Sequence, residues 1–160
     1  MGKNCIELDD NRAELMKQKQ GILKVSTPGQ GLTEITKQIS QWVDIQNISV
    51  GLLTIYIRHT SASLVVQENA DPSVVQDLEA YFKKLVPEDL SLYSHTAEGP
   101  DDMPAHIKGA LTETSLSVPI NNKQMVLGTW QGIFVFEHRY RPHLREVILH
   151  LSGMVDNKCD

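Results

Sequence analysis

Residues 115–151 read SLSVPINNKQMVLGTWQGIFVFEHRYRPHLREVILHL, and this stretch decides the fold class. Three strands are predicted in it, at 115–120, 125–137 and 145–151. The first two are joined by an Asn-Asn-Lys turn at 121–123, and Gly128 and Gly132 fall where bulges are compatible with the pattern. Because the three strands follow one another directly, we expect much of the sheet to be antiparallel, with the helices packed outside it.

Strands and helices alternate in the rest of the chain. Further strands are predicted at 22–26, 48–58 and 63–67, and helices at 33–45, 72–86 and 104–111. The middle helix is the most clearly marked, because Asp71 can cap it, Pro72 suits its first position and Pro87 ends it. The pattern predicts one α+β domain at 21–153, preceded by an arm at 1–20 and followed by a tail at 154–160.

Composition excludes several classes of protein. The chain has 160 residues, 41% of them hydrophobic, and a net charge of −5. These values argue against disorder and against a nucleic-acid binder that relies on bulk charge, and no apolar run is long enough to cross a membrane. The two cysteines, Cys5 and Cys159, lie near opposite ends, which favours free thiols in a reducing cytoplasm over a disulfide. Any metal site must therefore use histidine and carboxylate ligands.

The first polar cluster, Arg58-His59-Thr60-Ser61-Ala62-Ser63, follows an apolar strand. It offers a base, a cation and hydroxyl groups, so Ser-His chemistry is one interpretation, although no strained GxSxG turn is present. A turn whose hydroxyls satisfy backbone groups is the alternative. Close by, Asn69 could orient a ligand or form a turn, while capping accounts fully for Asp71.

The second cluster is the long loop from His95 to His106, HTAEGPDDMPAH. It holds two histidines and three carboxylates, and a loop of this length in a small domain is usually functional or disordered. Asp102 and His106 are four residues apart, so at the start of a helix they would share a face. Imidazole and carboxylate groups are ligands for Zn, Mn or Mg. The loop is therefore either a metal site or a solvated acidic segment.

The third cluster, Glu137-His138-Arg139, ends the longest strand. Alternation along a strand places Glu137 with Ile133 and Val135 on one face, and His138 with the phenylalanines on the other. His138 is thus either a buried core histidine or, if His95 and His106 reach it, a third metal ligand. His143 and His150 lie among surface-like charges and receive no role.

The same stretches resemble the YjbQ family, described as secondary thiamine-phosphate synthases. The matching motifs are HTSASL (59–64), ENADP (68–72), LVPED (85–89), HTAEGPDDMPAHIKGAL (95–111), SLSVPI (115–120) and LGTWQGIFVFEHR (127–139). The resemblance covers nearly the whole predicted domain, 21–153. The resemblance implies a sandwich-like antiparallel core, a homotrimer, and a metal-binding cleft near the subunit interfaces. It also implies a weak activity that joins hydroxymethylpyrimidine diphosphate to thiazole phosphate and releases diphosphate.

This chemistry needs a divalent cation and cationic side chains for the leaving diphosphate. The expected metal ligands are His95, His106 and His138. Asp102 and Glu137 are the expected catalytic carboxylates, and one or the other binds the metal or lies next to its ligands. The expected phosphate contacts are Arg58, Lys108 and Arg139, with hydroxyl donors from Thr60, Ser61 and Ser63. His59 is the expected acid or base, and Asn69 the residue that positions substrate.

Two other functions fit the same residues. One is a trimer that binds a metal or ligand without catalysis, and the other is a metal-dependent hydrolase of phosphorylated or ester substrates. The residue pattern is compatible with both Zn²⁺ and Mg²⁺.

Overall fold

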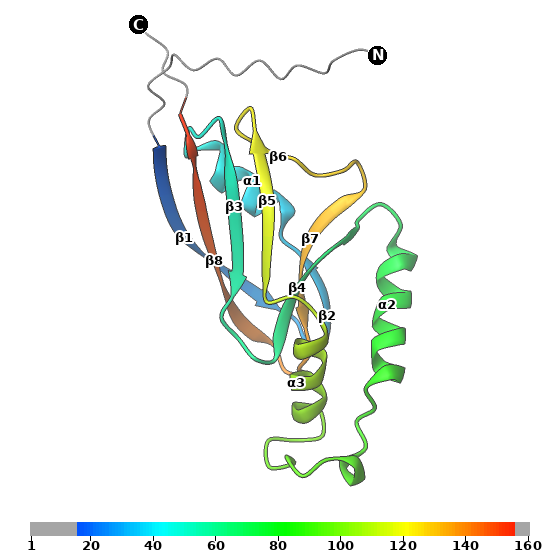
Figure 1. The fold of residues 1–160 in the computed structure, drawn as a ribbon. Helices are drawn as coiled ribbons and strands as arrows, with labels where there is room; N and C mark the ends of the chain where they lie inside the picture. The colour runs from blue at the N-terminus through cyan, green and yellow to red at the C-terminus, as the bar shows by residue number, and fades with distance from the viewer. Residues whose placement is uncertain (1–15, 156–160) are drawn as a thin grey trace, which may run out of the picture.

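Residues 16–155 are described by a computed structural model of the chain, which contains the following helices and strands (Figure 1). The strands are β1 (Met16–Thr27), β2 (Gly31–Glu34), β3 (Val50–Ile57), β4 (Ala62–Glu68), β5 (Ser115–Asn121), β6 (Gln124–Met125), β7 (Gln131–Glu137) and β8 (His143–Met154). The helices are α1 (Thr36–Asp44), α2 (Pro72–Leu85), a short 3-10 turn η1 (Leu90–Leu92) and α3 (Asp102–Leu111).

The strands form two antiparallel sheets. One sheet has five strands in the order β1-β8-β3-β5-β6, and the other has three in the order β2-β7-β4. Every strand pair in them is antiparallel. Of these pairs, only β5 and β6 are joined by a hairpin, whereas β7 and β8, which are consecutive in the chain, lie in different sheets. The prediction of a single α+β domain built mainly from antiparallel sheets is confirmed.

The core lies between the two sheets, and α1 completes its second layer. Alternate residues of the strands point inward, among them Leu53 and Ile55 of β3 and Ile133 and Val135 of β7. Ile39 and Val43 of α1 join the same cluster, which confirms the apolar stripe predicted for this helix. One face of each sheet is therefore buried in a shared core, as in a sandwich.

The outer face of the three-stranded sheet is covered by α2 and α3, which lie on the side of the molecule away from the five-stranded sheet (Figure 1). Phe82 of α2 packs edge-to-face on Phe136 of β7, with ring centroids 5.3 Å apart. No residue of α2 is fully buried. Helix α2 is thus a loose cover, and the space beneath it contains pockets.

The strands extend past both predicted ends of the domain. Strand β1 begins at Met16 and pairs with β8 along its whole length, so residues 16–20 of the predicted arm belong to the sheet. Likewise Met154, predicted to open the tail, ends β8. Residues 1–15 and 156–160, including Cys5 and Cys159, lie outside the described residues.

The predicted helix at 33–45 starts later, because Gly31–Glu34 pairs with β7 as the short strand β2. Gly29 and Gly31 permit this turn with φ values of +143° and +133°, which favour glycine. The predicted strand at 125–137 is divided into β6 and β7 by a loop that contains Gly128, whereas Gly132 pairs regularly with Gln67.

In the described residues, no helix combines the length and apolar character needed to span a membrane.

Candidate functional site

Two histidines and one aspartate form a cluster at the start of α3. His95 Nε2 lies 2.8 Å from Asp102 Oδ2, and His106 Nε2 lies 3.8 Å from the same oxygen. Asp102 opens α3 and His106 follows one turn later, so the helix places both on one face, as predicted. The Asp102 side chain is buried, whereas the imidazoles are 48% and 36% exposed.

Arg139 holds Asp102 in position. Its guanidinium contacts Asp102 Oδ1, donates from Nε to Asp101 Oδ2 at 3.1 Å, and donates from Nη2 to the carbonyl of Glu98 at 2.9 Å. These bonds tie the 95–106 loop to the chain after β7 and leave Asp102 Oδ2 directed at the two imidazoles. Arg139, predicted as a phosphate contact, thus occupies the place of a residue that orients a metal ligand.

The cluster has the donor set of a metal site. In the part of the chain that the structure describes, this is the one group of three such side chains whose ligand atoms lie within 4.8 Å of one another. In a tetrahedral zinc site, neighbouring ligand atoms are about 3.4 Å apart, and the distances to Asp102 Oδ2 bracket that value. Exposure of the imidazoles leaves the solvent side open. Asp102, predicted only as an accompanying carboxylate, is the third member.

His138 does not join this cluster. It is 1% exposed, and its Nε2 lies 2.9 Å from the hydroxyl of Ser63 in β4. Burial, and after it the positive charge of Lys108, lower the pKa of His138 to about 3, so the imidazole is neutral. His138 therefore continues the buried outer face of β7, as strand alternation predicts.

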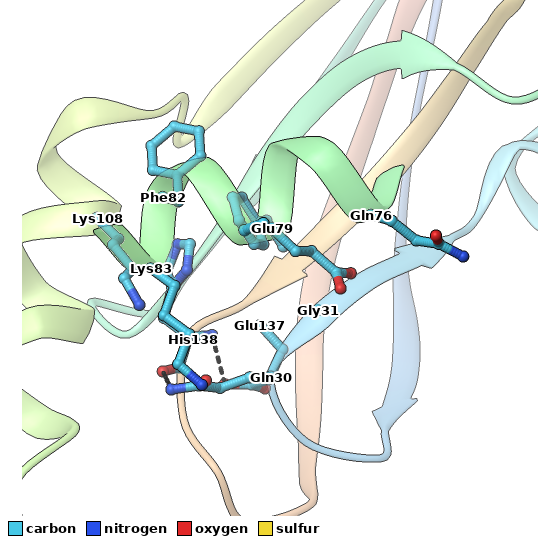
Figure 2. A pocket seen from close by; sticks show the side chains of 11 residues that line it. Gln30, Gly31, Gln76, Glu79, Phe82, Lys83, Lys108, Glu137 and His138 are labelled. Atoms are coloured by element: carbon cyan, nitrogen blue, oxygen red, sulfur yellow. Dashed lines mark hydrogen bonds between the residues drawn. The ribbon is translucent and has the colours of Figure 1, made fainter. Parts of the chain in front are cut away.

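Lys108 lies beside His138 in a pocket of about 340 Å³ under α2 (Figure 2). The residue is only 4% exposed, and burial lowers the pKa of its ammonium group. Gln30 lines the same pocket and donates from Nε2 to the carbonyl of His138 at 3.1 Å. The structure thus brings the predicted phosphate ligand Lys108 to His138 rather than to His95 and His106.

Glu137 points the opposite way, into the end of the core. Its Oε2 accepts hydrogen bonds at 2.7 Å from both Thr27 Oγ1 and Arg145 Nε. Its Oε1 accepts from the backbone amides of His138 and Arg139. Burial alone would raise the pKa of Glu137, but the hydrogen bonds from Arg145 and Thr27 outweigh it and lower this pKa. Both oxygens are occupied, so the predicted catalytic Glu137 has the contacts of a structural ion pair.

The HTSAS turn is divided between two environments. His59 Nε2 accepts a hydrogen bond from the amide of Glu146 at 2.9 Å, and Ser61 Oγ accepts one from Arg145 at 3.1 Å. Burial lowers the pKa of His59, and the Arg145 guanidinium adds to this effect. His59 and Thr60 also line a pocket of about 340 Å³ together with His106. Residues of the HTSAS turn therefore share this pocket with His106, a member of the cluster with His95 and Asp102.

The remaining predicted residues lie elsewhere. Arg58 is exposed and pairs with Glu146 at 3.6 Å, and Asn69 is exposed and donates to Glu34 Oε1 at 3.0 Å. Neither lines a pocket with the two clusters described above.

Sequence reasoning missed several partners. Arg145 sits in an alternating strand among surface-like charges, yet the register of β8 turns it inward. Thr112, which lies 2.6 Å from Ser63 Oγ, follows a helix end. Glu88 accepts a hydrogen bond from Tyr140 that raises the pKa of this phenol to about 12. Alternation could have placed Arg145 on the core face, but no local pattern marks Thr112 or Glu88.

Known proteins share both the sequence and the fold. The chain is 52% identical to a UPF0047 protein of Synechocystis sp. over 89% of its own length and 97% of that protein. It is 42% identical to the UPF0047 protein YjbQ of Escherichia coli O157:H7 over 84% of its length and 97% of that protein.

Among solved structures, a YbjQ-like protein of unknown function from Sulfolobus solfataricus P2 superposes with a TM-score of 0.80 at 26% identity. The match covers 87% of this chain and 99% of that one. Residues 21–154 match the family described as UPF0047 protein YjbQ-like. The chain therefore belongs to the YjbQ-like UPF0047 family.

Proposed function

We propose that this protein is a metal-dependent transferase of the secondary thiamine-phosphate synthase type. In the reaction, a ring nitrogen of thiazole phosphate forms a bond to the methylene carbon of hydroxymethylpyrimidine diphosphate. The carbon–oxygen bond to the diphosphate breaks, and diphosphate leaves with the electron pair. The observation that carries the proposal is the cluster of His95, Asp102 and His106.

The donor set favours a transition-metal ion. Two imidazoles and one carboxylate suit Zn²⁺ better than Mg²⁺, which prefers oxygen ligands and water. When bound, such an ion would neutralise the charge that develops on the departing diphosphate oxygens. Arg139 would hold the Asp102 carboxylate in register for the ion, because it fixes the other oxygen of that group.

In this proposal, the organic part of the diphosphate substrate binds in the pocket beside the cluster. It is lined by His59, Thr60 and His106, and it adjoins the open side of the imidazoles. Nε2 of His59 accepts a backbone hydrogen bond and Nδ1 lies 3.4 Å from Nη1 of Arg145, so both ring nitrogens face donors of the protein. His59 therefore shapes the wall of this pocket, and the proposal assigns it no proton transfer.

Metal content tests the site directly. Elemental analysis of the purified chain should show a divalent transition metal, and His95→Ala and His106→Ala should each lose most of it. His150→Ala, on the outer side of β8, is the matched control and should retain the metal. Full metal content in both His95→Ala and His106→Ala would show that these histidines are not the metal ligands.

Turnover tests the reaction. Product formation from the two named substrates should depend on the metal and should fall at least about 100-fold in Asp102→Asn, because the ligand charge is lost. Turnover by the wild-type chain that is no higher than that of Asp102→Asn would favour a protein that binds a metal or ligand without catalysis. Faster release of phosphate from a panel of phosphate esters than synthesis of thiamine phosphate would favour a hydrolase.

We also propose that the chain forms a homotrimer. In the described residues, no helix covers the outer face of the five-stranded sheet (Figure 1). Ile22, Leu52 and Tyr56 are exposed on this face. Apolar side chains of this kind are typical of a subunit interface. Light scattering should give three times the chain mass, and Leu52→Glu should shift it toward the monomer.

A further inference from the structure

A second polar pocket lies under α2, and it shares no lining residue with the His95–Asp102–His106 cluster. Its walls come from α2, from α3, and from the residues that end β7 and precede β2 (Figure 2). Its volume is about 340 Å³, which is in the range of small-molecule sites.

Lys108 gives this pocket a buried positive charge. Its side chain has no hydrogen bond and no ion pair with any residue that the structure describes. The carboxylates that line the pocket are engaged elsewhere: Glu79 accepts from the backbone amide of Leu32, and Glu137 binds Arg145. The ammonium group of Lys108 thus lines the pocket without a partner, and an anion bound there would supply one.

His138 gives the pocket a second polar group without a partner. Its Nδ1 is buried and has no hydrogen bond among the described residues. On the other edge of the ring, Nε2 contacts Ser63 Oγ, which in turn lies 2.6 Å from Thr112 Oγ1. Thr112 Oγ1 donates its one proton to the carbonyl of Lys108 at 2.7 Å, so Ser63 Oγ donates to Thr112 and accepts from Nε2–H of His138. Nδ1 is then a buried acceptor without a donor, and the ring forms part of the pocket wall beside Lys108.

The rest of the pocket fits a ligand with an organic body. Phe82 and Phe136 form an aromatic wall, and the amide of Gln30 and the exposed ammonium of Lys83 lie at the opening. A compact ammonium ion is a common ligand for phosphate, whereas aromatic faces suit a flat ring.

We propose that this pocket binds a phosphate monoester, with the phosphate at Lys108 and a small ring against Phe82 and Phe136. The inference deepens the proposed function and rests on it in one respect: the bound monoester would be the acceptor substrate, held apart from the metal-bound diphosphate. Binding itself follows from the pocket alone.

Calorimetric titration of the full-length protein tests the site with two probes, inorganic phosphate and phenyl phosphate. Both should bind, and phenyl phosphate should bind more tightly because of the aromatic wall. Lys108→Met should weaken the binding of both probes at least about tenfold. Methionine has nearly the same size as lysine but lacks its charged hydrogen-bond donor. The matched control, Lys84→Met, changes an exposed lysine of α2 outside the pocket and should leave both affinities unchanged.

Two further variants separate the possible outcomes. Phe82→Leu should weaken phenyl phosphate but not inorganic phosphate, and it keeps the test valid should Lys108→Met fail to fold. Asp102→Asn should lose the metal and retain phosphate binding, so failure of the metal proposal is distinguishable from failure of this one. The proposal is overturned by absence of binding to the wild-type chain, by equal binding to Lys108→Met, or by loss of binding in Asp102→Asn alone.

Discussion

Glu137 and His138 are adjacent in the chain, yet their side chains enter two buried polar clusters on opposite faces of β7. On the core face, the Glu137 carboxylate meets Arg145, and every oxygen has a donor. On the outer face, His138 and Lys108 each retain a polar group without a partner among the described residues. Burial is alike in both clusters, with no more than 5% of any of these four residues exposed.

The two clusters differ in whether the protein itself satisfies their buried polar groups. A buried pair with matched charges and complete hydrogen bonds closes one end of the sandwich and leaves nothing for a ligand to bind. A buried cation beside an unpartnered imidazole lowers stability unless a ligand completes it. The contacts of Glu137 are those of a structural ion pair, and its predicted catalytic role stays a prediction.

The largest effect should come from breaking the matched pair. Arg145→Met leaves the Glu137 carboxylate buried without its main partner, so the free energy of unfolding should fall by about 3–5 kcal/mol. Urea unfolding measures this change. Arg58→Met is the control, because it removes an exposed pair with Glu146 and should cost less than about 1 kcal/mol. Equal losses would show that the core-face pair is not structural.

An intermediate effect should appear on acidification. The pKa of His138 is about 3 in the folded chain and 6.5 in its ordinary state, because burial and the facing charges of Lys108 and Arg145 oppose protonation. Between these values the unfolded chain binds a proton that the folded chain does not. The free energy of unfolding should therefore fall by about 1 kcal/mol per pH unit from about pH 6.5 toward pH 3.

Glu137 also loses stabilising interactions as the pH falls, because its folded pKa is lowered. The comparison with His138→Gln isolates the histidine, since that variant lacks the titration and retains Glu137. Urea unfolding at a series of pH values should show a shallower slope for the variant. Identical slopes would contradict the neutral, buried state of His138.

The smallest effect should come from the unmatched cluster and should have the opposite sign. Lys108→Met removes a buried charge without a partner, so the free energy of unfolding should rise by about 1 kcal/mol. The same substitution should abolish the affinity for phosphate. Thermal unfolding without phosphate measures the gain. A loss of stability as large as that of Arg145→Met would mean that Lys108 is structural and would erase the distinction between the clusters.

Local patterns in the sequence predicted most of the elements. The apolar run at 131–137, the Asp71-Pro72 start of α2 and the stripe on α1 all depend on near neighbours, and the structure confirms them. The pairing of His95 with Asp102 and His106 was likewise predictable, because the three lie in one loop and the first turn of a helix. Strand β2 was missed, since four residues after a glycine turn carry too little periodicity.

The sequence by itself thus determined the α+β class, the antiparallel order and the histidine-rich loop, because each follows from residue spacing within one segment. Only the tertiary structure decided how the clusters are composed. Ser63 and His138 are 75 residues apart, and Thr27 and Glu137 are 110 apart. Such partners meet through strand register and sheet packing, so the surroundings of a buried charge, and with them its role, are fixed only when distant strands come together.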